Sequence, residues 1–265
     1  GRQITQNGLK EGQIEFSQPA LQAIIRDYTR EAGVRSLERE IGALCRRAAV
    51  EIAEGAIQSM TVDAGDLARI LGPAKYDNEV ALRTGLAGVA TGLAWTPVGG
   101  DILFIEASRT AGDGKLILTG QLGEVMKESA QAALTLVKTR ATSLGIDAGS
   151  FDRSNVHVHV PAGAIPKDGP SAGVAMFIAL ASLFVDRPVR NDTAMTGEIS
   201  LRGLVLPVGG IKDKVLAAMR AGIQRVLLPA RNRRDLEEVP AEAKERLEFV
   251  FLETVDDAVR HAMPQ

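Results

Sequence analysis

In the first quarter of the chain, apolar residues recur at the three- and four-residue spacing of amphipathic helices. Ser17 followed by Pro19 is a typical helix start, and a second helix is predicted from Ser36 to about residue 54. A third helix is predicted to begin near Asp63, a candidate N-cap, and to end at a Gly-Pro pair. We therefore expect residues 1–75 to form a small all-α helical domain.

From about Val80 the pattern changes to glycine-punctuated β segments with interspersed helices. Residues 155–161 alternate apolar and polar positions with the period of two that a half-buried strand requires. The other predicted strands are 101–108, 115–119, 225–228 and 248–252, and the predicted helices are 124–143, 171–185, 211–221 and 256–262. We therefore expect residues 76–265 to form an α+β domain, which makes the chain a mixed fold.

Composition narrows the class of protein only slightly. With 265 residues, 45% of them hydrophobic, the chain can bury a core, and its net charge of −2 demands neither nucleic acid nor an anionic membrane as partner. No apolar run approaches the ~20 residues that span a bilayer. Cys45 is alone, so an internal disulfide is excluded and a reducing compartment is favoured. Because residue 1 is Gly and no signal pattern follows, we expect a piece of a longer protein.

One candidate nucleophile lies where a glycine-bearing loop enters a predicted helix. Residues 167–173 read Lys-Asp-Gly-Pro-Ser-Ala-Gly, which places Ser171 at the helix start. Free backbone N–H groups and the positive end of a helix lie at such a junction, and acyl transfer needs donors of this kind beside its nucleophile. A plain N-cap role for Ser171 fits this segment equally well.

A serine nucleophile also needs a base, because an unassisted hydroxyl attacks poorly at neutral pH. The three histidines, His157, His159 and His261, have no obvious acid to orient them, and structural roles are favoured. Lys212 and Lys214 follow a glycine pair at a predicted helix start. Two positions apart on a helix, they point in different directions, so one can face inward while the other faces water. From the residues alone, a solvated lysine is the favoured interpretation of either one.

The two segments that hold these residues resemble the signature blocks of Lon proteases. Residues 167–173 are similar to the nucleophile motif of that family. The segment that begins with residues 196–203 and continues to Lys214 is similar to its second signature block. Further blocks follow in family order: residues 31–40 resemble the helical subdomain that closes the Lon ATPase module, 123–129 the start of the central helix, and 157–161 the strand leading to the nucleophile. Nearly the whole chain is covered, which identifies it as resembling the C-terminal part of an ATP-dependent Lon protease.

The resemblance implies a serine endopeptidase with a Ser-Lys dyad, in which Ser171 is the nucleophile and Lys214 the general base. Thr196 is expected to hydrogen-bond the lysine and fix its direction. The family further implies supporting roles near the active site for Asp168, Glu106, Gly169 and Pro170, with an oxyanion hole from the amides of residues 169–171, a substrate groove bordered by Trp95 and Pro97, and a nucleotide-sensing role for Arg35 in the full-length enzyme.

The resemblance also implies cofactors and partners. The expected substrates are unfolded or damaged polypeptides, handled by a cytoplasmic homohexamer in protein quality control. ATP and Mg²⁺ are expected for the full-length enzyme. Residues 112–116 lack the spacing and the hydroxyl of a phosphate loop, so we expect residues 1–265 by themselves to bind no cofactor. No metal motif is evident, and neither membrane nor DNA binding is indicated.

Two other functions fit part of the pattern. A loop of glycine and serine entering a helix can cradle phosphate, as in small-molecule kinases of related fold, although Pro170 lacks one N–H donor. A non-catalytic ring or adaptor module would leave Ser171 as a cap and Lys214 in solvent. The surroundings of Lys214 separate these hypotheses, because a general base needs a pKa lowered from ~10.4 towards ~7–8. Burial lowers it, and any close carboxylate would oppose the shift.

Overall fold

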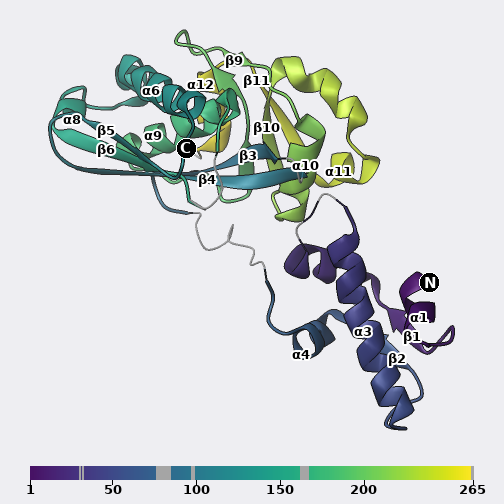
Figure 1. Cartoon of the computed structure of the whole chain (residues 1–265). Helices are drawn as coiled ribbons and strands as arrows, with labels where there is room; N and C mark the ends of the chain where they lie inside the picture. The colour runs from purple at the N-terminus through teal and green to yellow at the C-terminus, as the bar shows by residue number, and fades with distance from the viewer. Residues whose placement is uncertain (30, 32, 76–84, 97–98, 162–166, 264–265) are drawn as a thin grey trace. The chain divides into compact units, whose positions relative to one another are not determined.

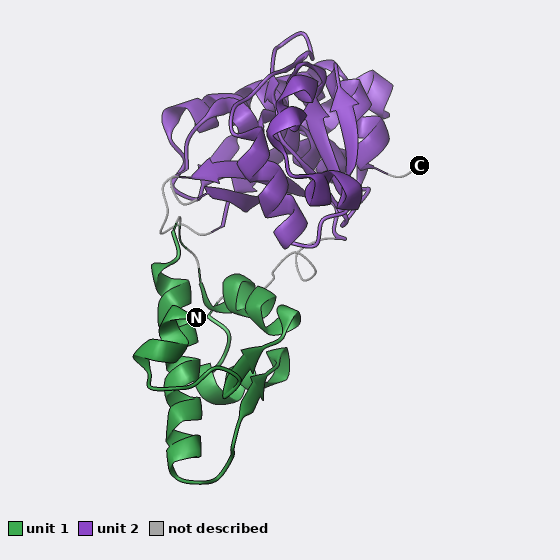
Figure 2. Ribbon diagram, turned by 90° about the vertical axis from the view of Figure 1, so that its right-hand side faces the viewer, with its two compact units in different colours: residues 1–78 green, residues 79–265 purple. Residues whose placement is uncertain are grey.

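The computed structural model describes residues 1–29, 31, 33–75, 85–96, 99–161 and 167–263 (Figure 1). The chain divides into two compact units, Gly1–Asn78 and Glu79–Gln265 (Figure 2). The predicted domain boundary after residue 75 lies close to this division. The boundary itself falls outside the described residues.

The first unit is mainly helical. Its elements are α1 (Arg2–Gln6), β1 (Ile14–Phe16), α2 (Gln18–Ala23), a π-helical turn η1 (Ile24–Tyr28), α3 (Arg35–Ala53), β2 (Met60–Val62), a 3-10 turn η2 (Ala64–Asp66) and α4 (Leu67–Leu71). The predicted cap at Ser17 is present, because its hydroxyl accepts a hydrogen bond from the Ala20 N–H at 3.2 Å. Ile24, Leu44 and Leu67 are buried in a core shared by these helices.

Two features of the first unit differ from the sequence-based expectation. β1 and β2 pair in parallel, and strands of three residues are too short to give a periodic signal. In α3, the Glu31 carboxylate accepts the N–H groups of Ser36 and Leu37 at 2.8 and 2.9 Å, whereas Ser36 itself lies inside the helix. Glu31, four residues before α3, therefore caps this helix.

The second unit is built on a seven-stranded mixed sheet in the order β11-β10-β7-β3-β4-β6-β5. Pairs β3–β4 and β4–β6 are antiparallel and the other pairs are parallel. The strands are β3 (Val89–Thr96), β4 (Gly99–Ala111), β5 (Leu116–Thr119), β6 (Ser154–His159), β7 (Thr193–Met195), β10 (Arg225–Pro229) and β11 (Glu248–Leu252), and β8 (Glu198–Ile199) pairs with β9 (Val205–Leu206) separately.

Helices pack on both faces of this sheet. The helical segments are α6 (Glu124–Thr139), α7 (Ala141–Leu144), α8 (Gly149–Asp152), η3 (Pro170–Ala172), α9 (Gly173–Val185), α10 (Ile211–Arg220), η4 (Ala230–Glu238), α11 (Ala241–Arg246) and α12 (Val255–Ala262). Leu103 and Ile105 of β4 join the core of α6 and α9, while Ile102 and Phe104 join that of α10. Because side chains alternate along a strand, α9 and α10 lie on opposite faces (Figure 1).

The central helix α9 is buried along nearly its whole length. Eleven of its thirteen residues are buried, and α9 contacts β3, β4, α6 and α12. It approaches β3 closely at Gly92, where an added Cβ would lie 3.4 Å from the Cβ of Ala175. Within the described residues, every helix is too short or too polar to cross a bilayer. The burial of α9 gives a fixed base to the residues at its N-terminus, including Ser171.

Candidate active site

Ser171 lies in the 3-10 turn that opens α9, and main-chain bonds hold that turn against the end of β7. Its carbonyl oxygen accepts the Gly197 N–H at 2.9 Å, and the Gly197 carbonyl accepts the Val174 N–H at 3.0 Å. Gly169, two residues before the serine, has φ +119°, in the left-handed region that side chains disfavour. The half-buried Ser171 therefore lies on a backbone that is fixed on both sides.

Lys214 lies in the first turn of α10, and its side chain is only 2% exposed. Lys212 on the same helix is exposed, as the two-residue spacing predicted for one of the pair. The helix packs directly on β4, since a Cβ at Gly100 would lie 2.0 Å from the carbonyl oxygen of Asp213. The backbone of the turn that carries Lys214 is therefore held directly against β4.

Burial changes the acid–base behaviour of Lys214. It lowers the pKa of the ammonium group from its ordinary value of 10.5 to about 8, since water no longer stabilises the charge. Within the described part of the chain, Lys214 makes no ion pair with a carboxylate that would oppose this shift. At pH 7 roughly a tenth of such amines are neutral.

Thr196 connects the lysine to the serine turn. Its buried hydroxyl accepts a hydrogen bond from Lys214 Nζ at 3.0 Å and donates to the carbonyl oxygen of Ser171 at 3.2 Å. No hydrogen bond joins the Ser171 hydroxyl directly to Lys214 among the described residues. Thr196 thus points the amine towards the serine turn, as expected of this residue.

Asp168 is engaged with a different helix. Its Oδ1 accepts the N–H groups of Met126 at 3.1 Å and of Gly169 at 2.9 Å, so the carboxylate caps the N-terminus of α6. Gly123 is needed beside it, because a Cβ there would lie 2.3 Å from Asp168 Cγ. Pro170 has no N–H group and the Gly169 N–H is bound by Asp168, so neither residue offers a free main-chain donor at the start of α9.

A second lysine, Lys167, is half-buried in the same loop. Lys167 Nζ donates to the carbonyl oxygen of Gly120 at 3.0 Å and more weakly to that of Val160 at 3.5 Å. Burial lowers the pKa of this ammonium group as well. These bonds hold the Lys167 side chain against the residues that follow β5 and β6.

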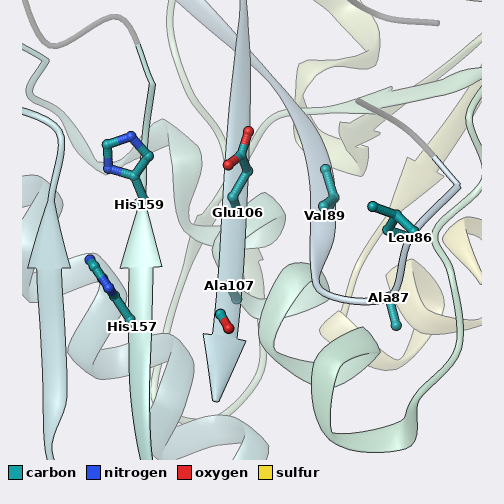
Figure 3. A pocket seen from close by; sticks show the side chains of 8 residues that line it. Leu86, Ala87, Val89, Glu106, Ala107, His157 and His159 are labelled. Carbon is teal, nitrogen blue, oxygen red and sulfur yellow. The ribbon is translucent and has the colours of Figure 1, made fainter. Parts of the chain in front are cut away.

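Glu106, His157 and His159 form a separate cluster. They line a shallow hollow of about 440 Å³ on the face of β4 and β6, together with Leu86 and other residues (Figure 3). The Thr119 hydroxyl lies 2.8 Å from His157 Nε2 and 2.7 Å from His159 Nδ1. Glu106 is six residues along β4 from Gly100, so at about 3.3 Å per residue it lies roughly 20 Å from the strand position beside Lys214.

The remaining expected residues lie in different surroundings. Trp95 is 58% exposed, and its indole Nε1 donates to Asp213 Oδ2 at 3.1 Å, beside the turn that holds Lys214. Pro97 lies outside the described residues. Arg35 is an exposed residue at the start of α3 in the first unit. Among the residues described, no cluster of three or more His, Cys, Asp or Glu side chains could hold a metal ion.

Asn232 is a buried polar residue near Lys214 in the chain's fold that the sequence did not single out. It is 3% exposed, and its amide bonds to the main chain of Val208, six residues before Lys214. A lone asparagine among arginines gives no signal of burial.

Comparisons with known proteins agree across both units. Residues 61–265 match the family model of the Lon protease (S16) C-terminal proteolytic domain, and residues 5–60 match that of the Lon protease AAA+ ATPase lid domain.

Curated relatives match over almost the whole chain. A Lon protease of Methylocella silvestris is 66% identical over 261 residues, which covers 98% of this chain and 32% of that protein. A Lon protease of Paraburkholderia phytofirmans is 64% identical, covering 98% of this chain and 32% of the relative. A Lon protease of Phenylobacterium zucineum is 63% identical, and the match covers 97% of this chain and 33% of that protein. The chain therefore spans about a third of the length of these relatives.

Proposed function

This chain belongs to the Lon protease family, and we propose that its second unit is a serine peptidase in which Ser171 attacks the peptide carbonyl and Lys214 is the general base. The observation that supports this dyad is a lysine that is 2% exposed, hydrogen-bonded to Thr196, and lowered in pKa to about 8. A solvated lysine would stay protonated at neutral pH.

The catalytic cycle follows from the protonation states of Lys214. In its neutral form, Lys214 accepts the proton of the Ser171 hydroxyl while the oxygen attacks the carbonyl carbon. The resulting ammonium then donates this proton to the leaving amine, which leaves an acyl ester on Ser171. Lys214, neutral again, deprotonates the water that attacks the ester, and then returns this proton to Ser171 Oγ as the carboxyl product leaves. Thr196 keeps the amine directed at the serine turn through both steps.

The developing negative charge needs donors at the start of α9. The Ser171 amide lies there, at the positive end of the helix. Asp168 contributes indirectly, because its carboxylate fixes Gly169 and the start of α6 at the same time. The anion at this position also argues against a phosphate cradle, since like charges repel.

For the full-length protein we extend the proposal by family. The match of the first unit to an AAA+ lid supports ATP and Mg²⁺ as cofactors of the longer protein. Arg35 is the proposed nucleotide sensor of that protein. Unfolded or damaged polypeptides are its proposed substrates, and we propose a cytoplasmic homohexamer whose active sites face a shared chamber.

The test uses a fluorogenic, unstructured peptide and two substitutions. Ser171→Ala and Lys214→Met should each lower kcat/KM by about 10³-fold or more, as removal of a nucleophile or base does elsewhere. Lys212→Met is the matched control on the same helix and should remain within about twofold. A peptidyl boronate should form an adduct on Ser171 Oγ. Loss of activity in Lys212→Met alone, or absence of the adduct on folded protein, would overturn the assignment.

A further inference from the structure

Asn232 makes an unusual pair of contacts for a side chain in an arginine-rich segment. Its Oδ1 accepts the Val208 N–H at 3.0 Å, and its Nδ2 donates to the Val208 carbonyl at 2.9 Å. Nδ2 also donates to the Asp235 carboxylate on the same segment. One side chain therefore satisfies both polar groups of a single backbone residue, as a neighbouring strand would.

The contact is built into the fold of the second unit. Within η4, Asn232 is the buried residue, while the flanking Arg231 and Arg233 are exposed. A buried amide is retained only where its hydrogen bonds are made, and three are made here. The Asp235 carboxylate accepts from Nδ2, which sets the orientation of the amide relative to Val208.

Val208 stands immediately before the turn that starts α10. Gly209 and Gly210 follow it, and Gly210 has φ +71° as the N-cap of the helix. The Lys214 N–H donates to the Gly210 carbonyl at 3.0 Å, the first helical bond leading to the lysine. Two consecutive glycines leave the backbone many accessible conformations, so the position of the helix start depends on contacts from outside the turn.

The other contacts on this turn come from β3 and β4, and the Trp95 side chain lies against Gly210 itself, 3.0 Å from where a Cβ would be. Trp95 Nε1 donates to Asp213, and Gly100 lies against the backbone of Asp213 and Lys214. Asn232 adds a contact before the glycine pair, on the main chain of Val208. Together they hold the first turn of α10 at both of its ends.

We propose that Asn232 is a positioning residue for the general base: by bonding both main-chain groups of Val208, it fixes the glycine turn that places Lys214 beside Thr196. This inference rests on the proposed function of Lys214. Asn232 touches neither the substrate nor the reacting atoms. It acts by fixing the position of the Lys214 amine and by keeping that amine away from water.

The expected consequence follows from what surrounds Lys214. The elements packed against α10 are β3, β4, η4 and α11, and their charged residues include Asp101 and Glu106 on β4 and Asp235 on η4. The others are Arg109 on β4, Arg231, Arg233, Arg234, Glu237 and Glu238 on η4, and Glu242, Lys244, Glu245 and Arg246 on α11. Desolvation alone lowers the Lys214 pKa. If the turn loosens, water reaches the amine, and its pKa rises towards that of a free lysine.

The experiment compares Asn232→Ala with the parent in the whole chain. We expect kcat for an unstructured peptide to fall about tenfold with KM nearly unchanged, and the pH–rate profile to move up by about one pH unit. The ¹³Cε resonance of Lys214, assigned by its loss in Lys214→Met, should titrate about one unit higher. This resonance does not depend on turnover, so a parent that cleaves no peptide would overturn the proposed function while the positioning role is still measured.

Ser182→Ala is the matched control. Ser182 is a fully buried side chain that also ties two distant main-chain groups, the N–H of Gly88 and the carbonyl of Arg187, but on α9. It should lower thermal stability without moving kcat or the Lys214 titration. If Asn232→Ala behaves like Ser182→Ala, the positioning role is overturned. If Asn232→Ala does not fold, Asp235→Asn decides, with a smaller shift in the same direction expected and an unchanged titration overturning the proposal.

Discussion

Replacing Lys214 by methionine should make the second unit more stable at neutral pH while removing its proposed base. The buried ammonium group has a pKa of about 8 against 10.5 for a free lysine, so the folded state holds this proton more weakly than the unfolded chain. At pH 7 the lysine is mostly protonated in both states, and the pKa difference corresponds to a destabilisation on the order of 3 kcal/mol. Methionine fills a similar space without charge. Subtracting about 1 kcal/mol for the lost bond to Thr196 leaves a net gain of roughly 2 kcal/mol.

The gain should depend on pH in a defined direction. Between about pH 8 and pH 10.5 the unfolded chain binds more protons at this site than the folded chain, so the stability of the parent rises with pH in that window. By about pH 9.5 roughly 2 kcal/mol of the destabilisation is relieved. The advantage of Lys214→Met should therefore disappear there, because methionine does not titrate.

Urea unfolding at about pH 7 and about pH 9.5 measures this difference. Trp95 is the single tryptophan of the chain and lies on β3, so its fluorescence reports the second unit. Lys212→Met is the control, with an expected change within about 0.5 kcal/mol at both pH values. The reasoning is refuted if Lys214→Met is less stable than the parent at neutral pH, or if the difference is the same at both pH values.

Two further predictions concern the same unit. The kcat/KM of the parent for an unstructured peptide should rise about tenfold from pH 7 towards a plateau above pH 8, because only the neutral Lys214 accepts a proton; a pH–rate profile checks this, and a flat profile would contradict it. Asp168→Ala should lower the free energy of unfolding by about 1 kcal/mol through loss of the α6 cap, measured by urea titration, while the ¹³Cε titration of Lys214 stays in place; a shifted titration would show that the carboxylate acts on the lysine.

The sequence predicted the elements whose two faces differ. α3, α6 and β6 carry a clear apolar stripe or alternation, and residues 248–252 form β11 with the predicted bounds. β3 and β7 escaped prediction because both lie in the middle of a sheet with helices on both faces. Close packing requires small residues there, such as Gly92 against α9, so these strands show no alternation of apolar and polar positions.

The site was predictable only in part. Helical spacing indicated that Lys212 and Lys214 point apart, but which one is buried depends on how α10 packs on distant segments such as β4, whose Gly100 lies against the backbone of Asp213 and Lys214. Ser171 stood out by its loop. Its partners Thr196 and Gly197 and the cap that Asp168 gives to α6 are contacts between distant segments, and no local pattern encodes them.

The buried course of α9 has a consequence for synthesis on the ribosome. The strands β3 and β4 precede this apolar helix and can shelter one of its sides early, but α12, which packs on another side, is made long afterwards. Until α12 emerges, the nascent chain exposes an apolar segment of the kind that chaperones bind and that drives aggregation. Premature termination before α12 would leave this stretch uncovered in a polypeptide that already contains every residue of the proposed dyad.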